Sequence, residues 1–183
     1  MQTNMNLTVE FKGTQTILGV PARYQGSQDD ITPKGGFISN NNTEGNAIFG
    51  YIMSVNKAAD AEELLVGANG TGDANNVIVG PLLNDQAVRM FDPAKPNWKM
   101  NGMPATVVRE GTLLYNKWNK TATNAIDPVM GCRVIANNST GEIQFLPAGN
   151  TVPSGWTQIQ AVVVDVDTFN GVVALYFEVG AGT

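Results

Sequence analysis

Apolar and polar residues alternate most clearly near the C-terminus, over residues 158–179. Residues 161–166 form an almost unbroken β-branched run, and residues 172–179 continue with β-branched and aromatic side chains. Between them, Asn170 and Gly171 are the two residue types that adopt positive φ most easily. This pattern predicts a β-hairpin. Apolar side chains fall on both of its faces, so we expect each face to be covered.

Two further hairpins are predicted upstream from the same rhythm. Each consists of two short apolar runs joined by turn residues that include Gly or Asn. Short strands at this spacing are typical of β-sandwiches and barrels. The predicted strand pairs are residues 105–109 with 112–116 and residues 131–136 with 142–146.

The central part of the chain predicts two more strands and a long connection. Residues 47–55 form a clear apolar strand, and residues 77–83 form another that Pro81 interrupts. Residues 89–103 contain too many prolines for a strand ladder, so we expect a long surface excursion there.

One short helix is predicted after the apolar strand at 47–55. Asn56 is a typical helix N-cap, and Gly67 is a typical residue beyond a helix end. Between them, Ala61, Leu64 and Leu65 share one face at helical spacing.

Residues 1–36 are poor in large apolar groups and rich in Gly, Pro and Asp. Within them Leu7, Val9 and Phe11 alternate with polar residues, as one short strand would. This segment is an extended arm ordered against a partner, or else a first strand and a long loop of the same domain. We predict an N-terminal arm over residues 1–36 and a single domain over residues 37–183. The predicted fold is all-β, a jelly-roll-like barrel or β-sandwich with one short helix.

Composition narrows the classes of function. The chain has 183 residues and a net charge of −5, and its charged residues, at 15%, fall below the usual share of about 25%. A surface this poor in charge suggests permanent association with other subunits. We also expect a homo-oligomer, a dimer or trimer. Lys and Arg form no basic cluster, which disfavours nucleic-acid binding. There is no apolar stretch of membrane-spanning length and no pattern of a signal peptide, so we expect no membrane insertion and synthesis in a reducing cytoplasm.

Few residues in this chain are suited to catalysis or metal binding. It has no histidine and one cysteine, Cys132, which excludes His-based acid–base catalysis, Cys–His pairs and disulfides within the chain. The Gly-rich segment 67–72 does not match a phosphate-binding loop, and no calcium-binding loop is present. Asp165 and Asp167 could share one strand face as a hydrolase pair, but their position before a turn favours a structural role. We therefore predict no enzymatic activity, no cofactor and no metal.

Aromatic residues beside basic ones are the best candidates for contact with a partner. Trp98 and Trp118 lie in segments rich in Lys and Asn, and Tyr24 follows Arg23. Exposed Trp, Tyr and Arg are common anchors in protein interfaces. For each Trp the alternative is a lid that folds back over the end of a barrel. The predicted partner-binding residues are Leu7, Val9, Phe11, Arg23, Tyr24, Trp98 and Trp118.

The stretch 80–179 resembles the structural cement, or capsid decoration, proteins of tailed bacteriophages. The segments that carry the resemblance are 47–50, 111–115, 127–131, 134–136 with 141–145, and 161–165 with 173–177. The resemblance implies a β-barrel or jelly-roll-like body on the outside of a phage capsid. The partners would then be major capsid protein subunits, which the protein ties together, and the expected location is the virion surface.

Two other functions remain open at this point. A carbohydrate- or receptor-binding module of a phage fibre or head would use Trp98, Trp118 and Tyr115 as a sugar-binding surface. A hydrolase would use the acidic pair Asp165 and Asp167. Residues 7–11 suggest an arm that adds a strand to the sheet of a neighbouring subunit, which is compatible with any of these functions.

Overall fold

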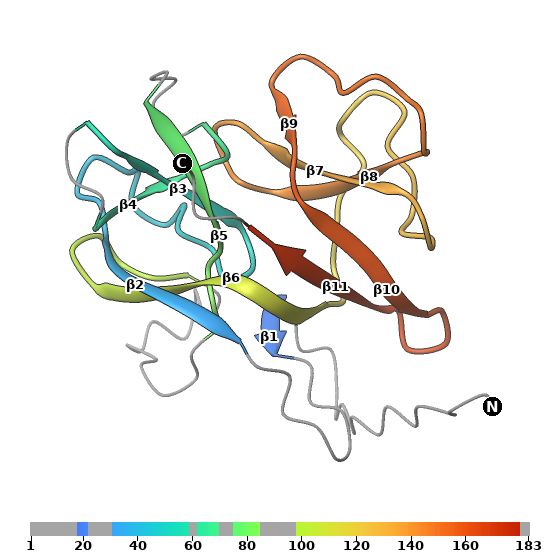
Figure 1. Cartoon of the computed structure of the whole chain (residues 1–183), viewed down its shortest axis with the longest axis horizontal. Coiled ribbons are helices and arrows are strands. Elements are labelled where there is room, and N and C mark those ends of the chain that lie inside the picture. Colours follow the sequence, from blue (N-terminus) through green and yellow to red (C-terminus); the bar gives the residue numbers. More distant parts are fainter. Residues whose placement is uncertain (1–17, 22–30, 59–61, 70–74, 85–97, 180–183) are drawn as a thin grey trace.

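The computed structural model describes residues 18–21, 31–58, 62–69, 75–84 and 98–179. These residues form eleven β-strands and no helix, so the fold is all-β, as predicted (Figure 1). None of the described residues forms a helix that could span a bilayer. The strands are β1 Leu18–Pro21, β2 Thr32–Ile38, β3 Ile52–Asn56, β4 Glu63–Val66, β5 Asn76–Pro81, β6 Pro104–Tyr115, β7 Arg133–Asn137, β8 Ile143–Leu146, β9 Trp156–Gln158, β10 Ala161–Asp167 and β11 Val172–Glu178.

Five strands close into a small barrel in the order β6, β2, β4, β3 and β5. The end of β5 returns to β6 through a bridge between Leu82 and Val107. Gly80 allows this approach, because a Cβ atom at its position would lie 2.0 Å from the carbonyl oxygen of Val108. The buried residues inside the barrel are Ile38, Ala47, Phe49, Met53, Val55, Leu64, Val66, Val79, Leu82, Ala105 and Val107.

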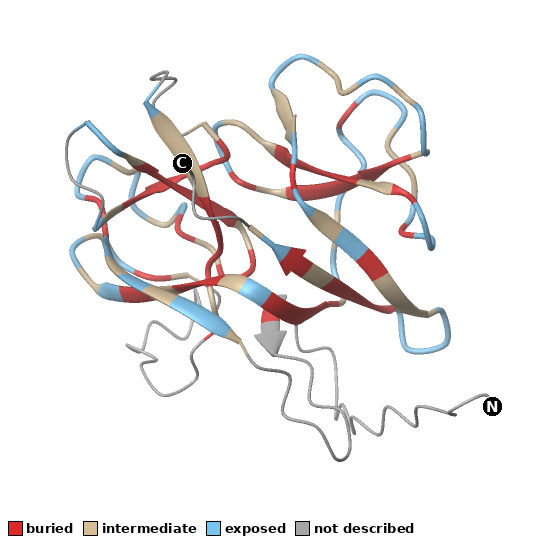
Figure 2. Ribbon diagram, in the orientation of Figure 1, coloured by how far each residue is buried: buried red, intermediate tan, exposed pale blue. Residues whose placement is uncertain are grey.

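The second half of β6 leaves the barrel and joins a β-sandwich. It pairs with β11, which pairs with β10, and this part of the large sheet packs against a small sheet in the order β8, β7, β9. Figure 2 shows buried positions on the facing strands of both sheets. The largest buried side chains between them include Leu113, Phe145, Leu175 and Phe177.

The predicted hairpin at residues 105–116 is wrong, because this segment is the single strand β6 of twelve residues. Glu110 and Gly111 do not reverse the chain; they pair with Glu178 and Phe177 of β11. β2 pairs with β6 from Pro104 to Glu110, and β11 pairs with it from Glu110 to Tyr115. Neighbouring strands thus keep the segment extended through the Gly111 position.

The predicted helix is also wrong where the structure describes it, because residues 63–66 form β4. The side chains of Leu64 and Val66 belong to the core of the barrel. The backbone of β4 pairs with β3, with Leu65 opposite Ser54. β4 runs parallel to β2, with Ile38 opposite Leu64. Pairing on both edges outweighs the helical spacing of a short segment.

Part of the predicted arm belongs to the barrel and sandwich. β1 pairs with the end of β6, and β2 lies between β6 and β4. The predicted domain boundary after residue 36 therefore falls inside β2. Residues 1–17 and 22–30, and with them most of the predicted arm, lie outside the described residues.

The other predicted strands are confirmed in their main parts. The hairpin of β10 and β11 turns at residues 168–171, and β7 and β8 form the second predicted hairpin. β5 ends at Pro81, as a strand interrupted by proline should. Of the predicted strand at 47–55, only residues from Ile52 onwards pair as β3.

Candidate partner-binding site

Five of the seven predicted contact residues lie outside the described part of the chain. They are Leu7, Val9, Phe11, Arg23 and Tyr24, and their role stays a prediction. The structure places the other two, Trp98 and Trp118, at separate positions on the body.

Trp98 lies beside the segment that leads into β3. It forms a bridge with Ile48, and the N–H of Lys99 donates to the carbonyl oxygen of Ala47 at 2.8 Å. The Trp98 side chain is half-buried, whereas Met100 is 44% exposed. Residues 98–100 thus fasten the end of the long connection to the barrel and leave an apolar side chain at the surface.

Trp118 lies over the small sheet. Its ring meets the Phe145 ring edge-on with centroids 6.1 Å apart, and its indole N–H donates to Asp127 Oδ1 at 3.1 Å. Lys120 Nζ forms an ion pair with Asp127 Oδ2 at 2.9 Å. The hydrogen bonds from Lys120 and from Trp118 lower the pKa of Asp127. This arrangement fits the lid interpretation of Trp118 better than an open aromatic platform.

Tyr115 cannot contribute to a sugar-binding surface. It is buried, and its hydroxyl donates to the carbonyl oxygen of Gly50 at 3.0 Å. Its ring packs against Phe177 with centroids 6.2 Å apart. Burial raises the pKa of the Tyr115 phenol well above its usual value.

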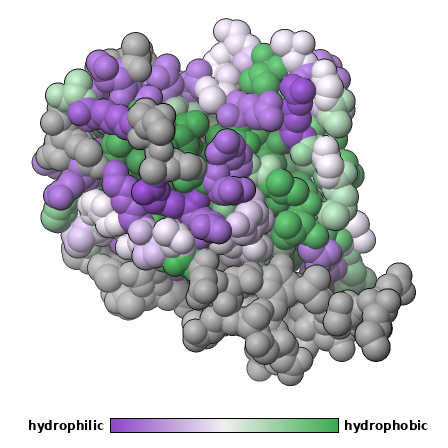
Figure 3. Space-filling view, viewed as in Figure 1, coloured by the Kyte–Doolittle hydropathy of each residue, from purple (hydrophilic) through white to green (hydrophobic). Residues whose placement is uncertain are grey.

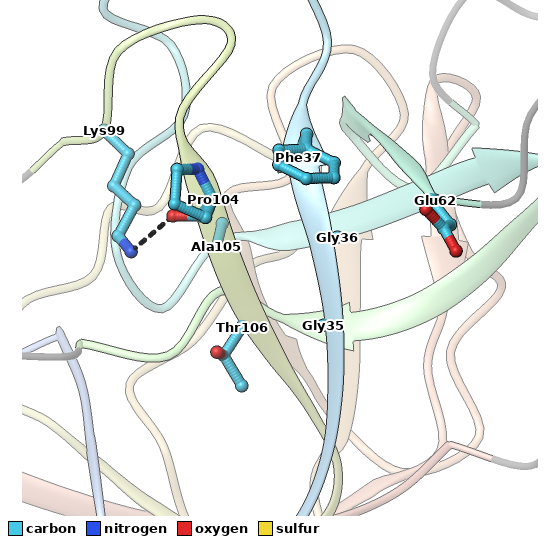
Figure 4. Close-up of a pocket in the computed structure, with 8 residues that line it drawn as sticks. All are labelled: Gly35, Gly36, Phe37, Glu62, Lys99, Pro104, Ala105 and Thr106. Carbon is cyan, nitrogen blue, oxygen red and sulfur yellow. Dashed lines mark hydrogen bonds between the residues drawn. The ribbon is translucent and has the colours of Figure 1, made fainter.

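A groove of about 500 Å³ lies over β2 and β6 (Figure 4). In the strand register Phe37 is opposite Pro104, and Gly35 is opposite Thr106. Phe37 is 52% exposed, so one end of the groove presents an apolar ring. The groove is lined by Gly35, Gly36, Phe37, Glu62, Lys99, Pro104, Ala105 and Thr106.

The two adjacent glycines in β2 have different surroundings. A Cβ atom at Gly36 would lie 2.5 Å from the carbonyl oxygen of Glu62, so close packing against β4 requires glycine there. A Cβ atom at Gly35 would meet nothing within 4 Å. Glycine inside a strand costs roughly 0.5–1 kcal/mol relative to alanine. Packing therefore does not explain why residue 35 is glycine. Because Gly35 has no side chain, the strand backbone is left bare on the floor of the groove.

One basic and one acidic residue, Lys99 and Glu62, border the groove. Lys99 is only 4% exposed, and its Nζ donates to the carbonyl oxygen of Pro104 at 3.0 Å. In Figure 4, Lys99 and Glu62 lie on opposite sides of the strand that carries Gly35 and Gly36. The groove therefore presents an apolar ring beside bare strand backbone, with one basic and one acidic residue at its border.

Sequence reasoning missed this groove. Its two walls come from β2 and from the segment 99–106, which are far apart in the sequence. The one available signal was a pair of glycines inside an otherwise extended segment.

The two candidate catalytic carboxylates have structural partners. Asp167 Oδ1 accepts hydrogen bonds from the N–H groups of Phe169 and Asn170, both at 3.0 Å, and Oδ2 accepts one from Asn170 Nδ2. The Asn170 side chain is the main reason why the pKa of Asp167 is lowered. Asp165 Oδ1 accepts from the N–H of Val166 at 2.8 Å. Asp167 therefore stabilises the turn of the hairpin, and Asp165 bonds the neighbouring backbone beside the bulge in β10.

The remaining candidates for chemistry also have structural roles. Cys132 is buried, and desolvation raises the pKa of its thiol, which disfavours the reactive thiolate. Gly67 lies against Asn138, whose carbonyl oxygen would be 2.2 Å from a Cβ atom there. Among the described residues, no three His, Cys, Asp or Glu side chains gather where they could bind a metal. No protein-family model matches this chain, and no curated protein matches it.

Proposed function

We propose that this protein is a non-enzymatic structural protein of a virion, one that binds the outer surface of a phage capsid. In this role it bridges major capsid subunits and stabilises the head. The resemblance of residues 80–179 to capsid decoration proteins supports the proposal. The structural roles found for Asp165, Asp167 and Cys132 support it further, because they leave these residues poorly suited to catalysis.

The observation that carries the proposal is the groove over β2 and β6 with its exposed apolar border. Ile38 N–H donates to Met103 O at 2.9 Å, so the segment that contains Met100 lies against the end of β2. Phe37 and Met100 thus project from neighbouring segments, at 52% and 44% exposure. Exposed apolar side chains beside a groove with bare backbone are typical of protein-binding surfaces.

A capsid subunit would place an extended segment in this groove, with an apolar side chain against Phe37. Residues 7–11, the predicted strand of the arm, would supply a second contact on a neighbouring subunit. Once the first contact forms, the second becomes effectively intramolecular, so two modest contacts give a tight clamp.

The test uses purified phage heads from which this protein has been removed. We expect the wild-type protein to bind these heads in co-sedimentation and to restore their resistance to heat. The double substitution Phe37→Ser and Met100→Ser should weaken binding by at least about tenfold, because hot-spot residues contribute more than 1 kcal/mol each. Met130→Ser is the matched control, since Met130 is 67% exposed on a different loop.

Two results would contradict the proposal. The first is heads whose heat resistance does not change when the protein is removed or added back. The second is selective binding on a glycan array with no binding to heads, which would favour the carbohydrate-binding alternative. Binding that survives both substitutions would leave capsid attachment intact and exclude this groove as its site.

A further inference from the structure

One edge of the large sheet is open among the described residues. β10 is the terminal strand, and within the described part of the chain β11 is the only strand that pairs with it. Such an edge presents a row of unpaired N–H and C=O groups, which proteins often protect with charged residues, Pro or a bulge. β10 contains no Lys or Pro, and its charged residues, Asp165 and Asp167, lie in its second half. Its one irregularity is a bulge at Val164, the residue that has no partner in β11.

The two ends of the β10–β11 hairpin carry complementary features. At the start of β10 is a groove of about 480 Å³, lined by Val162 and Tyr176 among others, and Val162 is 56% exposed. At the other end, in the turn, Phe169 is 95% exposed. Figure 3 shows hydrophobic residues gathered on the surface over β10 and β11. The sequence pattern predicted apolar residues on both faces of this hairpin, yet the single chain leaves part of one face uncovered.

The Phe169 side chain is presented by a well-defined turn. Asp167 accepts three hydrogen bonds from the turn, two from backbone N–H groups and one from the Asn170 side chain. An aromatic residue on a preorganised turn loses little conformational entropy when a partner covers it.

We propose that two copies of this chain pair antiparallel through β10 about a two-fold axis, so that each Phe169 enters the groove of the other copy. Antiparallel pairing places the end of one β10 beside the start of the other. A register centred on Val164 puts Asp167 opposite Ala161 of the second copy and Phe169 beside Ile159, which lines the groove. A two-fold interface requires one surface that is complementary to itself, and this hairpin has both the inserting side chain and the groove.

In this register the β10 carboxylates of the two copies do not face each other. Each chain has a net charge of −5, so carboxylates that faced each other would oppose association. Centred on Val164, Asp165 lies opposite Val163, and Asp167 lies opposite Ala161. The exposed side chains of Gln158 and Gln160 border the groove and can donate to the incoming Asp167, while the carboxylate of Glu178 also lines it. The case for a second copy as the occupant therefore rests on the register, which brings Phe169 to the groove and keeps the β10 carboxylates of the two copies from facing each other.

The test is the oligomeric state of the full-length protein, measured by sedimentation velocity across the micromolar range. We expect a dimer, and we expect Phe169→Ser to raise its dissociation constant by at least about tenfold, as loss of a buried aromatic anchor does. Met130→Ser, the control at another exposed side chain, should leave the dimer unchanged. Far-ultraviolet circular dichroism of each variant checks that the fold is retained.

A cross-link tests the register separately. Val164→Cys brings two thiols together across the axis, so mild oxidation should give a disulfide-linked dimer, while Ala148→Cys on an exposed turn should not. A wild-type monomer at all concentrations would overturn the proposal and leave the edge for a strand of another protein. The proposal would also be overturned by a dimer whose dissociation constant does not change in Phe169→Ser and which forms no disulfide in Val164→Cys. Neither measurement involves phage heads, so the result is independent of the proposed function.

Discussion

Gly141 and Gly155 illustrate two reasons why a position requires glycine, a positive φ and a close approach of other backbone. Both have positive φ, +75° and +82°, which costs about 1–2 kcal/mol for any L side chain. A Cβ atom at Gly141 would also lie 2.2 Å from the carbonyl oxygen of Ile52, whereas one at Gly155 would meet nothing within 4 Å. We predict that Gly141→Ala lowers the free energy of unfolding by about 3 kcal/mol or more, because backbone must move. Gly155→Ala should cost only about 1–2 kcal/mol.

Urea unfolding of both variants measures the difference. Equal losses would mean that the loop of Gly141 moves freely away from β3. In the structure the Ile52 N–H donates to Gly141 O at 2.8 Å, which holds this loop in place.

At the residue scale, the sequence predicted what a side chain can do better than where it lies in the fold. The lack of histidine excludes His-based catalysis, and the turn role of Asp167 could be inferred from its neighbours in the sequence. The burial of Tyr115 could not, because the local pattern predicts residues 112–116 as the second strand of a hairpin, whereas they belong to the end of a long strand inside a sandwich. The groove floor at Gly35 was equally hidden, because Thr106 and Pro104 become its neighbours only through pairing between strands.

At the scale of elements, Gln144 fastens a loop to the small sheet. Gln144 is fully buried in β8, and its Oε1 accepts from the N–H groups of Thr121 and Ala122 at 3.0 and 2.9 Å. Its Nε2 donates to Thr121 Oγ1 at 2.7 Å. We predict that Gln144→Leu lowers the free energy of unfolding by about 2–4 kcal/mol, because two N–H groups lose their acceptor. Hydrogen exchange at Thr121 and Ala122 should accelerate in the same variant.

Thr121→Val provides the graded control, since it removes one side-chain partner of Gln144 and leaves both backbone bonds. It should cost about 1 kcal/mol. If Gln144→Leu cost no more than Thr121→Val, the backbone N–H groups would have found water, and the loop would not depend on Gln144.

Elements set by local signals were predictable, and those set by distant pairing were not. Asn170 and Gly171 specify the turn of the last hairpin within four residues, and this hairpin is confirmed. The strand at 63–66 depends on β2, more than twenty residues away, and its spacing alone fits a helix. Gly111 likewise looks like a turn residue until β11 pairs across it.

At the scale of the whole molecule, two tyrosines lie where the barrel meets the sandwich. The Tyr115 hydroxyl at the end of β6 donates to Gly50 O, and Tyr51 follows Gly50 in the segment that leads into β3. Burial, with a smaller contribution from the negative charge of Glu142, raises the pKa of Tyr51 to about 12. Burial also raises the pKa of Tyr115. Ionisation of either phenol therefore works against the contact between the two halves.

The sign of the pH dependence follows from these raised pKa values. An unfolded tyrosine ionises near pH 10, so the stabilisation is complete below about pH 10 and is lost as pH rises through the folded pKa values. We predict that the free energy of unfolding falls steeply between about pH 10 and 12, and that tyrosinate absorbance of the folded protein rises late. Tyr115→Phe should lower stability at neutral pH by about 1 kcal/mol, through the lost hydrogen bond, and make the alkaline fall shallower. A wild-type protein whose stability is flat to pH 12, or a variant with the same slope, would show that water reaches this junction and that the two halves are not held together there.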